Sequence, residues 1–202
     1  MLIVFGGSFD PVHRGHLAMA DAAQKHLSPE RLLWVPSGHA PHKPDLPPAA
    51  PEQRAAFLHA VVDARPGEEV CAMELQRPGL SYTVDTLKEL RLQYPHPAFG
   101  FLLGGDSLEH LLTWRDLPTL FQQVEFLFVP RTGWGEARLD PFRNSLPDAL
   151  RPLFRARFLD MPVVDARSTE IRAALNRGQM PEAVPEPVAE LIRAGTCYGF
   201  RA

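Results

Sequence analysis

The sequence predicts an α/β fold in which helices cover both faces of a parallel β-sheet. Short apolar runs alternate with stretches of helical periodicity along most of the 202 residues. Several of these runs, such as FGFLLGG and VEFLFVP, are almost entirely apolar, which is typical of strands buried on both faces. Hydrophobic residues make up 45% of the chain, so a sizeable core is expected and disorder is not. We therefore predict a doubly wound parallel sheet.

Six runs are expected to form the strands of this sheet. They cover residues 2–5, 32–36, 69–74, 99–104, 124–129 and 157–164. Helices are expected between or after them, at residues 15–27, 52–64, 83–94, 108–112, 168–176 and 187–194. Helical connections of about 10–15 residues are what a parallel sheet needs to bring the chain back to the same edge. We expect residues 1–202 to form one domain, in which residues 165–202 make a small C-terminal helical part.

Two segments between these elements lack regular periodicity. Residues 37–50 are rich in proline and follow the second strand, and residues 131–147 are broken by glycine and proline after the fifth strand. Both would lie at the carboxyl ends of parallel strands, where doubly wound sheets bind their ligands. The alternative, that they are ordinary surface loops, stays open.

Composition and charge exclude several classes of protein. The formal net charge of −3 argues against a general nucleic-acid-binding surface, although it is compatible with a local basic cluster for a small ligand. No run of about 18 apolar residues is present, so no membrane span is expected. The first residues lack the basic region of a signal peptide, and Cys71 and Cys197 indicate neither a disulfide framework nor a metal spacing. We predict a cytoplasmic protein that binds small molecules.

The segment VFGGSFDPVHRGHLAMA joins the first strand to the first helix. Gly6 and Gly7 permit backbone dihedrals that other residues avoid, and they let backbone N–H groups approach a ligand. The helix that follows begins near Gly15, and its N-terminus carries free N–H groups and a partial positive charge that suit a phosphate. His13 and His16 lie on one side of that turn, where both imidazoles can donate to phosphate oxygens. The structural alternative is that one histidine caps the helix and the other is exposed.

Two other segments place a cation near a strand end or a helix entrance. Lys43, in the loop sequence PHK, follows the second strand and can reach a phosphate; the alternative is an exposed basic loop. In VDARSTEIRAAL, Ser168 and Thr169 begin a predicted helix, and Arg172 lies one turn further along. Hydroxyls and an arginine at a helix N-terminus suit a phosphate, although a capped amphipathic helix explains them equally.

Polar side chains also gather at the entrance of the predicted helix at residues 83–94. Either Ser81 or Thr83 would cap this helix. Capping alone does not account for Tyr82 and Thr86 at the same entrance. We therefore expect these side chains to line a polar pocket.

The segment FLLGGDSLEHLLTW follows the fourth predicted strand. Asp106 comes directly after two glycines, Gly104 and Gly105, where a carboxylate can bond a ribose hydroxyl or cap the next helix. Trp114 is either a core residue or a flat surface on which a planar ring stacks. The functional interpretation of Asp106 and Trp114 is that both line a nucleotide pocket beside this strand.

The motif GGSFDPVHRGH resembles the signature of the nucleotidyltransferase superfamily that carries a HxGH motif. That motif also occurs in class I aminoacyl-tRNA synthetases, which are much larger and carry a tRNA-binding region. With PHK, SYTxDTL, a GxD followed by a tryptophan, and STxIR, the chain resembles bacterial nicotinate-nucleotide adenylyltransferases from Leu2 to about Gly199. One departure is Arg167, which stands where that family usually has a serine.

The resemblance implies a Rossmann-like nucleotidyltransferase fold and adenylyl transfer from ATP to nicotinate mononucleotide, with release of pyrophosphate. It implies that Mg²⁺ accompanies ATP and is held mainly by phosphate oxygens and water, without metal ligands from the protein. Because the acceptor phosphate is already an anion, we expect no general base and predict catalysis by positioning and charge stabilisation. The catalytic residues implied are His13, His16, Lys43 and Arg172. Those implied for ATP or phosphate are Gly6, Gly7, Ser8, Phe9, Gly104, Asp106, Ser168 and Thr169, and those for the mononucleotide are Tyr82, Thr83, Thr86, Trp114 and Arg131.

For the acceptor, the resemblance implies that Trp114 stacks on the pyridine ring and that Thr83 and Thr86 receive its carboxylate. A carboxylate needs donors where a carboxamide needs at least one acceptor, so this pocket would favour the acid. Two alternatives stay open. One is an adenylyl- or cytidylyltransferase for another phosphorylated acceptor, such as nicotinamide mononucleotide. The other is a non-catalytic nucleotide sensor. The sequence leaves a homo-oligomer possible.

Overall fold

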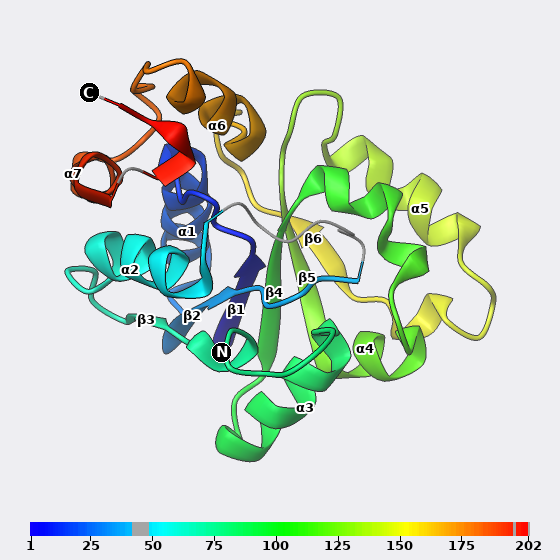
Figure 1. The fold of residues 1–202 in the computed structure, drawn as a ribbon. Coiled ribbons are helices and arrows are strands. Elements are labelled where there is room, and N and C mark those ends of the chain that lie inside the picture. The colour runs from blue at the N-terminus through cyan, green and yellow to red at the C-terminus, as the bar shows by residue number, and fades with distance from the viewer. Residues whose placement is uncertain (42–48, 196, 202) are drawn as a thin grey trace.

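The computed structural model describes residues 1–41, 49–195 and 197–201. Six strands in this part of the chain form one sheet: β1 (Leu2–Gly7), β2 (Arg31–Pro36), β3 (Glu68–Val70), β4 (Phe99–Gly104), β5 (Val124–Val129) and β6 (Ala156–Phe158). Their order is β3-β2-β1-β4-β5-β6, and every neighbouring pair is parallel (Figure 1). The chain reverses its direction across the sheet between β1 and β4, which confirms the predicted doubly wound topology.

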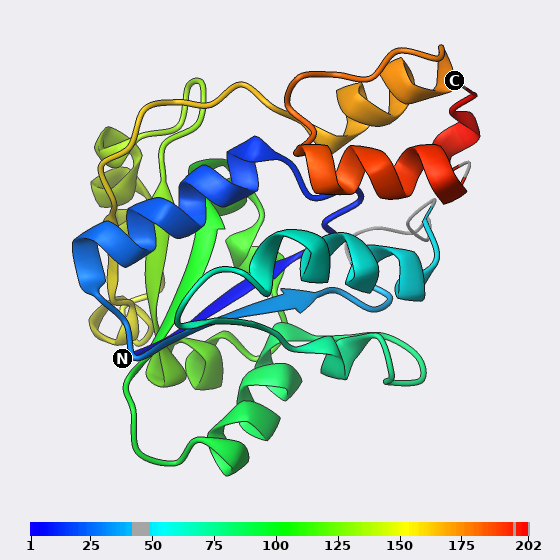
Figure 2. The same cartoon turned by 90° about the vertical axis from the view of Figure 1, so that its left-hand side faces the viewer.

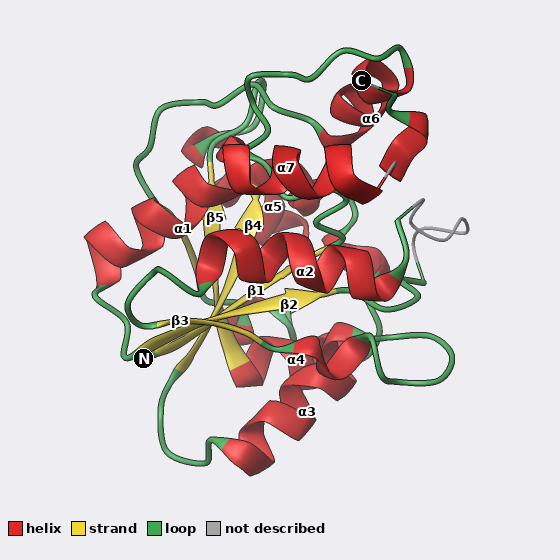
Figure 3. Cartoon of the chain, turned by 60° about the vertical axis from the view of Figure 1, so that its left-hand side comes forward, coloured by secondary structure: helices red, strands yellow, loops and turns green. Residues whose placement is uncertain are grey.

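Helices cover both faces of this sheet. In the described residues they are α1 (Arg14–Leu27), α2 (Pro51–Val62), α3 (Thr83–Gln93), α4 (Leu117–Gln123), α5 (Leu139–Ser145), α6 (Ser168–Asn176) and α7 (Glu186–Gly195). Figures 2 and 3 show α1, α2 and α7 on one face of the sheet and α3 on the other. None of these helices has the length and apolar character needed to cross a membrane.

The two faces of the sheet bury two separate apolar cores. Ile3 and Phe5 of β1 pack into one core with α1, α2, α6 and α7. Leu2 and Val4 of the same strand pack into the other with α3, α4 and α5. Because successive side chains of a strand point to opposite faces, β1 needs apolar residues at every position. Burial of both faces thus explains why the sequence contains uninterrupted apolar runs.

Three predicted elements end or fold differently from expectation. The strand expected at residues 69–74 ends at Val70, and a 3₁₀ turn at Ala72–Glu74 follows it. The strand expected at residues 157–164 ends at Phe158. Both are edge strands, so each forms hydrogen bonds with a single neighbouring strand. Each strand ends where its backbone no longer pairs with that neighbour. The helix expected at residues 108–112 is instead parts of two 3₁₀ turns, at Gly105–Glu109 and Leu111–Thr113.

Two helices were not predicted. Helix α4 begins after Asp116, whose side chain accepts a hydrogen bond from the Thr119 backbone N–H at 3.4 Å. Helix α5 lies inside residues 131–147, which the proline and glycine content indicated to be a loop. Its Leu139 is buried in the core beside α3 and α4, so tertiary packing favours this short helix over the local breakers.

Candidate functional site

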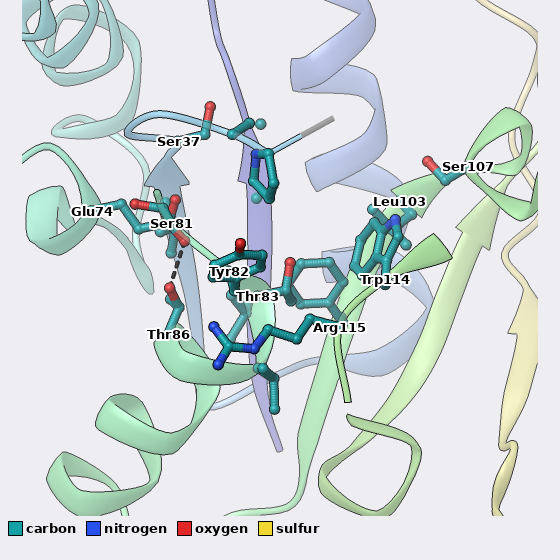
Figure 4. A pocket seen from close by; sticks show the side chains of 18 of the residues that line it. Ser37, Glu74, Ser81, Tyr82, Thr83, Thr86, Leu103, Ser107, Trp114 and Arg115 are labelled. Carbon is teal, nitrogen blue, oxygen red and sulfur yellow. Dashed lines mark hydrogen bonds between the residues drawn. The ribbon is translucent and has the colours of Figure 1, made fainter. Parts of the chain in front are cut away.

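Two cavities open at the carboxyl end of the sheet. The first, here called the α3 cavity, has a volume of about 280 Å³ and lies between the end of β1 and the entrance of α3 (Figure 4). The second, here called the histidine cavity, has a volume of about 470 Å³ and is lined by both histidines of the HxGH motif. Neighbouring residues line different cavities, Asp106 the histidine cavity and Ser107 the α3 cavity, so the two adjoin at the end of β4.

The predicted site residues divide between these cavities. The predicted mononucleotide residues Tyr82, Thr83, Thr86 and Trp114 line the α3 cavity, together with Gly6, Gly7 and Ser8. The predicted phosphate residues His13, His16, Asp106, Ser168 and Thr169 line the histidine cavity, which Arg131 also lines. The resemblance assigns Arg131 to the mononucleotide, whereas in the structure it lines the same cavity as the two histidines. Lys43 lies outside the described residues, and its assignment stays a prediction.

The loop between β1 and α1 is compact and tightly packed. Phe9 adopts φ 48°, in the left-handed region that residues with a Cβ rarely occupy. Its buried ring packs edge-on against Phe5, with 5.2 Å between ring centroids. A Cβ on Gly7 would lie 3.0 Å from that ring, so a side chain there would crowd it and glycine avoids the contact. Phe9 thus supports the loop from the core.

The two histidines form a stacked pair at the start of α1. Their ring centroids are 3.7 Å apart, and the backbone N–H of His13 donates to Nδ1 of His16 at 3.2 Å. This bond makes Nδ1 of His16 an acceptor, so a neutral His16 carries its proton on Nε2. His13 is the N-cap residue of α1, so the pair lies at the positive end of the helix.

His13 is buried and uncharged at neutral pH. Only 2% of the residue is exposed, and burial together with the nearby Arg131 guanidinium lowers the pKa of His13 to about 4. In the described part of the chain, neither Nδ1 of His13 nor Nε of Arg131 has a hydrogen-bond partner, although both atoms are buried. The Arg131 guanidinium and the positive end of α1 lie at the wall of this cavity, where they favour negative charge. The histidine cavity therefore suits an anion.

Asp106 and Arg131 meet over Gly104 at the end of β4. A Cβ on Gly104 would lie 2.5 Å from Oδ1 of Asp106 and 3.1 Å from Nε of Arg131. Because Gly104 has no side chain, Asp106 and Arg131 can both lie close to the end of β4.

The N-terminus of α6 is tied to the β1–α1 loop. The Ser168 hydroxyl donates to the carbonyl of Pro11 at 3.2 Å, and Arg172 donates to the carbonyl of Asp10 at 2.8 Å. Arg167, the departure noted above, is largely exposed and faces Glu170 at 4.0 Å. The contacts of Arg172 are therefore with the loop, and its role toward pyrophosphate stays a prediction.

Polar and aromatic side chains form the walls of the α3 cavity (Figure 4). The Trp114 ring meets Phe101 edge-on, with 5.9 Å between centroids, and lines the cavity. Arg115 also lines it, and its guanidinium lies over the Tyr82 ring, 4.6 Å from the centroid. An aromatic wall with a cation close by suits a flat, negatively charged ring.

Thr86 is engaged with a carboxylate that sequence reasoning missed. Its hydroxyl donates to Oε1 of Glu74 at 2.6 Å (Figure 4) and accepts from Arg77 at 2.9 Å. The other oxygen of Glu74 accepts from the Gly38 backbone N–H at 3.3 Å, and burial raises the pKa of Glu74. A hydroxyl has one proton to donate, so in this arrangement Thr86 has none for a substrate carboxylate. Thr83 remains available in the same wall.

Arg54 is a second residue that sequence reasoning missed. It is only 1% exposed and donates to two backbone carbonyls, that of Ser8 at 2.9 Å and that of Ser37 at 2.7 Å. These bonds join the loops after β1 and β2. A signal was present, because Arg54 is three and four residues before the buried Phe57 and Leu58 and so shares the apolar face of α2.

The described residues contain no group of three or more histidine, cysteine, aspartate or glutamate side chains arranged to hold a metal ion. Cys71 and Cys197 are free thiols. The candidate site thus consists of the two adjoining cavities, with carboxylates and cations distributed along their walls.

Comparison with known proteins places this site in a family. The profile of the cytidylyltransferase-like family matches residues 4–174. A probable nicotinate-nucleotide adenylyltransferase of Moorella thermoacetica is 36% identical over 197 residues, covering 96% of this chain and 90% of the relative. One from Opitutus terrae is 37% identical over 195 residues, covering 96% and 95%.

A solved structure shares the fold. The Plasmodium falciparum nicotinic acid mononucleotide adenylyltransferase complexed with NaAD superposes with a TM-score of 0.73 over 99% of this chain and 98% of that one, at 17% identity. At that identity the likeness concerns the fold, whereas the sequence relatives share more than a third of their residues. This chain therefore belongs to the cytidylyltransferase-like family and, within it, to the nicotinate-nucleotide adenylyltransferases.

Proposed function

We propose that this protein transfers the adenylyl group of ATP to nicotinate mononucleotide, giving nicotinate adenine dinucleotide and pyrophosphate. The observation that carries the proposal is the pair of adjoining cavities at the ends of β1 and β4, one with stacked histidines and one with a tryptophan wall. The reaction needs two anionic substrates side by side, with the acceptor phosphate in line with the α-phosphorus of ATP. The names of the relatives support the same reaction.

The triphosphate would occupy the histidine cavity. The N-terminus of α1 offers a partial positive charge there, and a neutral His16 carries its proton on Nε2. Phosphate oxygens beside His13 would raise its pKa from about 4, because a nearby negative charge favours the imidazolium. Both rings would then stabilise the charge that develops as pyrophosphate leaves.

Magnesium fits this site as a companion of ATP. Asp106 and Asp165 line the histidine cavity, and Mg²⁺ is commonly held by one or two carboxylates plus substrate phosphates. When bound, the ion would neutralise phosphate charge as the bond to the leaving group breaks. The described residues supply no fuller ligand set, so the phosphates and water would provide most of the ligands.

The acceptor would lie in the α3 cavity, with its pyridine ring beside Trp114. Its phosphate is anionic at neutral pH, so no side chain has to remove a proton from it. The preference for the acid over the amide would come from donors along the wall, among them Thr83 and Arg115.

The test is a product assay with ATP, Mg²⁺ and either nicotinate mononucleotide or nicotinamide mononucleotide, the dinucleotide being quantified by chromatography. We expect product from the acid and far less from the amide. We also expect H16N to lower kcat by more than about 100-fold, because it removes a charge-stabilising donor. The matched control is H96N, since His96 is exposed and precedes β4, at the end of that strand opposite to the cavities. Equal product from both acceptors would refute the acid preference, and no product from either would refute the proposed reaction.

A further inference from the structure

Asp10 is a buried meeting point for three distant parts of the chain. It is 1% exposed, although it lies in the loop between β1 and α1. Its Oδ1 accepts from the Tyr198 hydroxyl at 2.6 Å and from the Ala49 backbone N–H at 3.3 Å. Its backbone carbonyl accepts from Arg172 at 2.8 Å, and the Arg172 guanidinium is 3.8 Å from Oδ2. The loop is thus held from the start of α2, from α6 and from the C-terminal turn.

Tyr198 makes the shortest of these contacts from an unfavourable backbone conformation. It adopts φ 59° in the turn Cys197–Gly199, the left-handed region that a tyrosine rarely occupies. Such a conformation persists only where surrounding contacts hold it. Burial, and then the neighbouring Asp10, raise the pKa of Tyr198 above its ordinary value, so the hydroxyl stays a donor. The ring lies 6.3 Å from that of Phe57 in α2, which fixes its direction.

The loop that receives this bond is the one that presents the histidine pair. Asp10 lies three residues before His13, and Phe9 beside it is itself in the left-handed region. Several contacts are therefore needed to keep the loop in one conformation, and the Tyr198 hydroxyl supplies one of them. Tyr198 lies outside residues 4–174, to which the family profile extends.

We propose that Tyr198 is a positioning residue for the reaction: through its hydrogen bond to Asp10 it holds the β1–α1 loop in the conformation that places His13 and His16 at the phosphates. The proposal rests on the proposed function for its kinetic readout. The C-terminal turn, which is shown in red in Figure 2, thereby helps to hold the β1–α1 loop in place.

The test is a double-mutant cycle of Y198F and D10N, in which kcat is measured with ATP, Mg²⁺ and nicotinate mononucleotide. We expect Y198F to lower kcat about tenfold, which corresponds to about 1.4 kcal/mol of transition-state free energy, with the KM of the acceptor within about twofold. If the hydroxyl acts through Asp10, the double variant is no slower than D10N alone. The matched control is Y94F, which removes the hydroxyl of a tyrosine at the end of α3 and should keep wild-type kcat.

A second readout separates positioning from simple loss of stability. We expect the imidazole proton resonances of His13 and His16 to shift in Y198F at a temperature where circular dichroism shows the variant folded, while that of His96 stays in place. This readout needs no turnover. An inactive wild-type protein would therefore refute the proposed reaction, whereas the resonances would still test whether the bond from Tyr198 to Asp10 positions the histidines. Wild-type kcat in Y198F, multiplicative effects in the cycle, or unmoved His13 and His16 resonances would each overturn the positioning role.

Discussion

His13 carries no charge near neutral pH in the folded protein, and this makes stability depend on pH in the acid range. Burial and the Arg131 guanidinium lower the pKa of His13 from 6.5 to about 4. In the unfolded chain the ring is in water and takes up a proton near pH 6.5. Between pH 6.5 and about 4 the unfolded state therefore binds more protons than the folded state, so the free energy of unfolding falls as the pH is lowered.

The size of this effect follows from the two pKa values. A lowering from 6.5 to about 4 corresponds to about 3 kcal/mol, because each tenfold change in proton affinity is worth about 1.4 kcal/mol. That contribution is fully present above pH 6.5 and is lost by about pH 4. A loss of this size is a large part of the 5–15 kcal/mol or so by which most domains are stable.

The assay compares urea unfolding of the wild-type protein and H13N at pH values from about 4.5 to about 7.5. Carboxyl groups titrate in the same range in both proteins, so the difference between the two curves isolates the histidine. We expect the wild-type protein to lose more stability than H13N toward low pH. Parallel curves, or a His13 pKa near 6.5 measured by proton resonance titration, would refute the reasoning that burial keeps this ring neutral.

Two further substitutions test the supports of the site. G104A would put a Cβ 2.5 Å from Oδ1 of Asp106, so we expect kcat/KM to fall at least about tenfold; G135A, where a Cβ would meet no described atom within 4 Å, should keep wild-type kcat/KM, and equal values for both variants would contradict the steric argument. R54M would leave the carbonyls of Ser8 and Ser37 without this donor, so we expect a loss of about 2–4 kcal/mol in the free energy of unfolding by urea denaturation, and a loss below about 1 kcal/mol would contradict it.

The central strands were predictable because helices cover both of their faces, which requires apolar side chains along the strand. A strand covered on both faces must be apolar where it is buried, and β4 is apolar throughout, whereas β5 departs only at the partly exposed Glu125. Edge strands follow no such rule, and both β3 and β6 end earlier than their apolar character indicates. Helix α4 is different again, since its signal was local: an aspartate at position 116 followed by a proline is typical of a helix start.

The gathering of the site residues was predictable for a topological reason. The motifs follow β1, β4 and β5, and the carboxyl ends of parallel strands meet at one edge of the sheet. Their division into two cavities was not predictable, because it depends on the direction in which each side chain leaves its loop. Arg131 illustrates this, since its place in the sequence is equally compatible with either cavity and only the folded chain directs it toward His13.

The partners that support the loop between β1 and α1 could not be paired from the sequence, although the position of Arg54 on the apolar face of α2 indicated that it is buried. Arg54 binds the carbonyl of Ser8 across 46 residues, and Tyr198 binds Asp10 across 188. The acceptor at Ser8 is a backbone carbonyl, which every residue has, so the residue type there does not indicate the bond. The acceptor at Asp10 is a side-chain carboxylate, but no spacing rule connects it to a tyrosine 188 residues away. Yet both bonds act on the segment that carries the HxGH motif. The histidines are therefore identified by their motif, whereas the geometry that makes them useful depends on residues whose function becomes visible only in the folded chain.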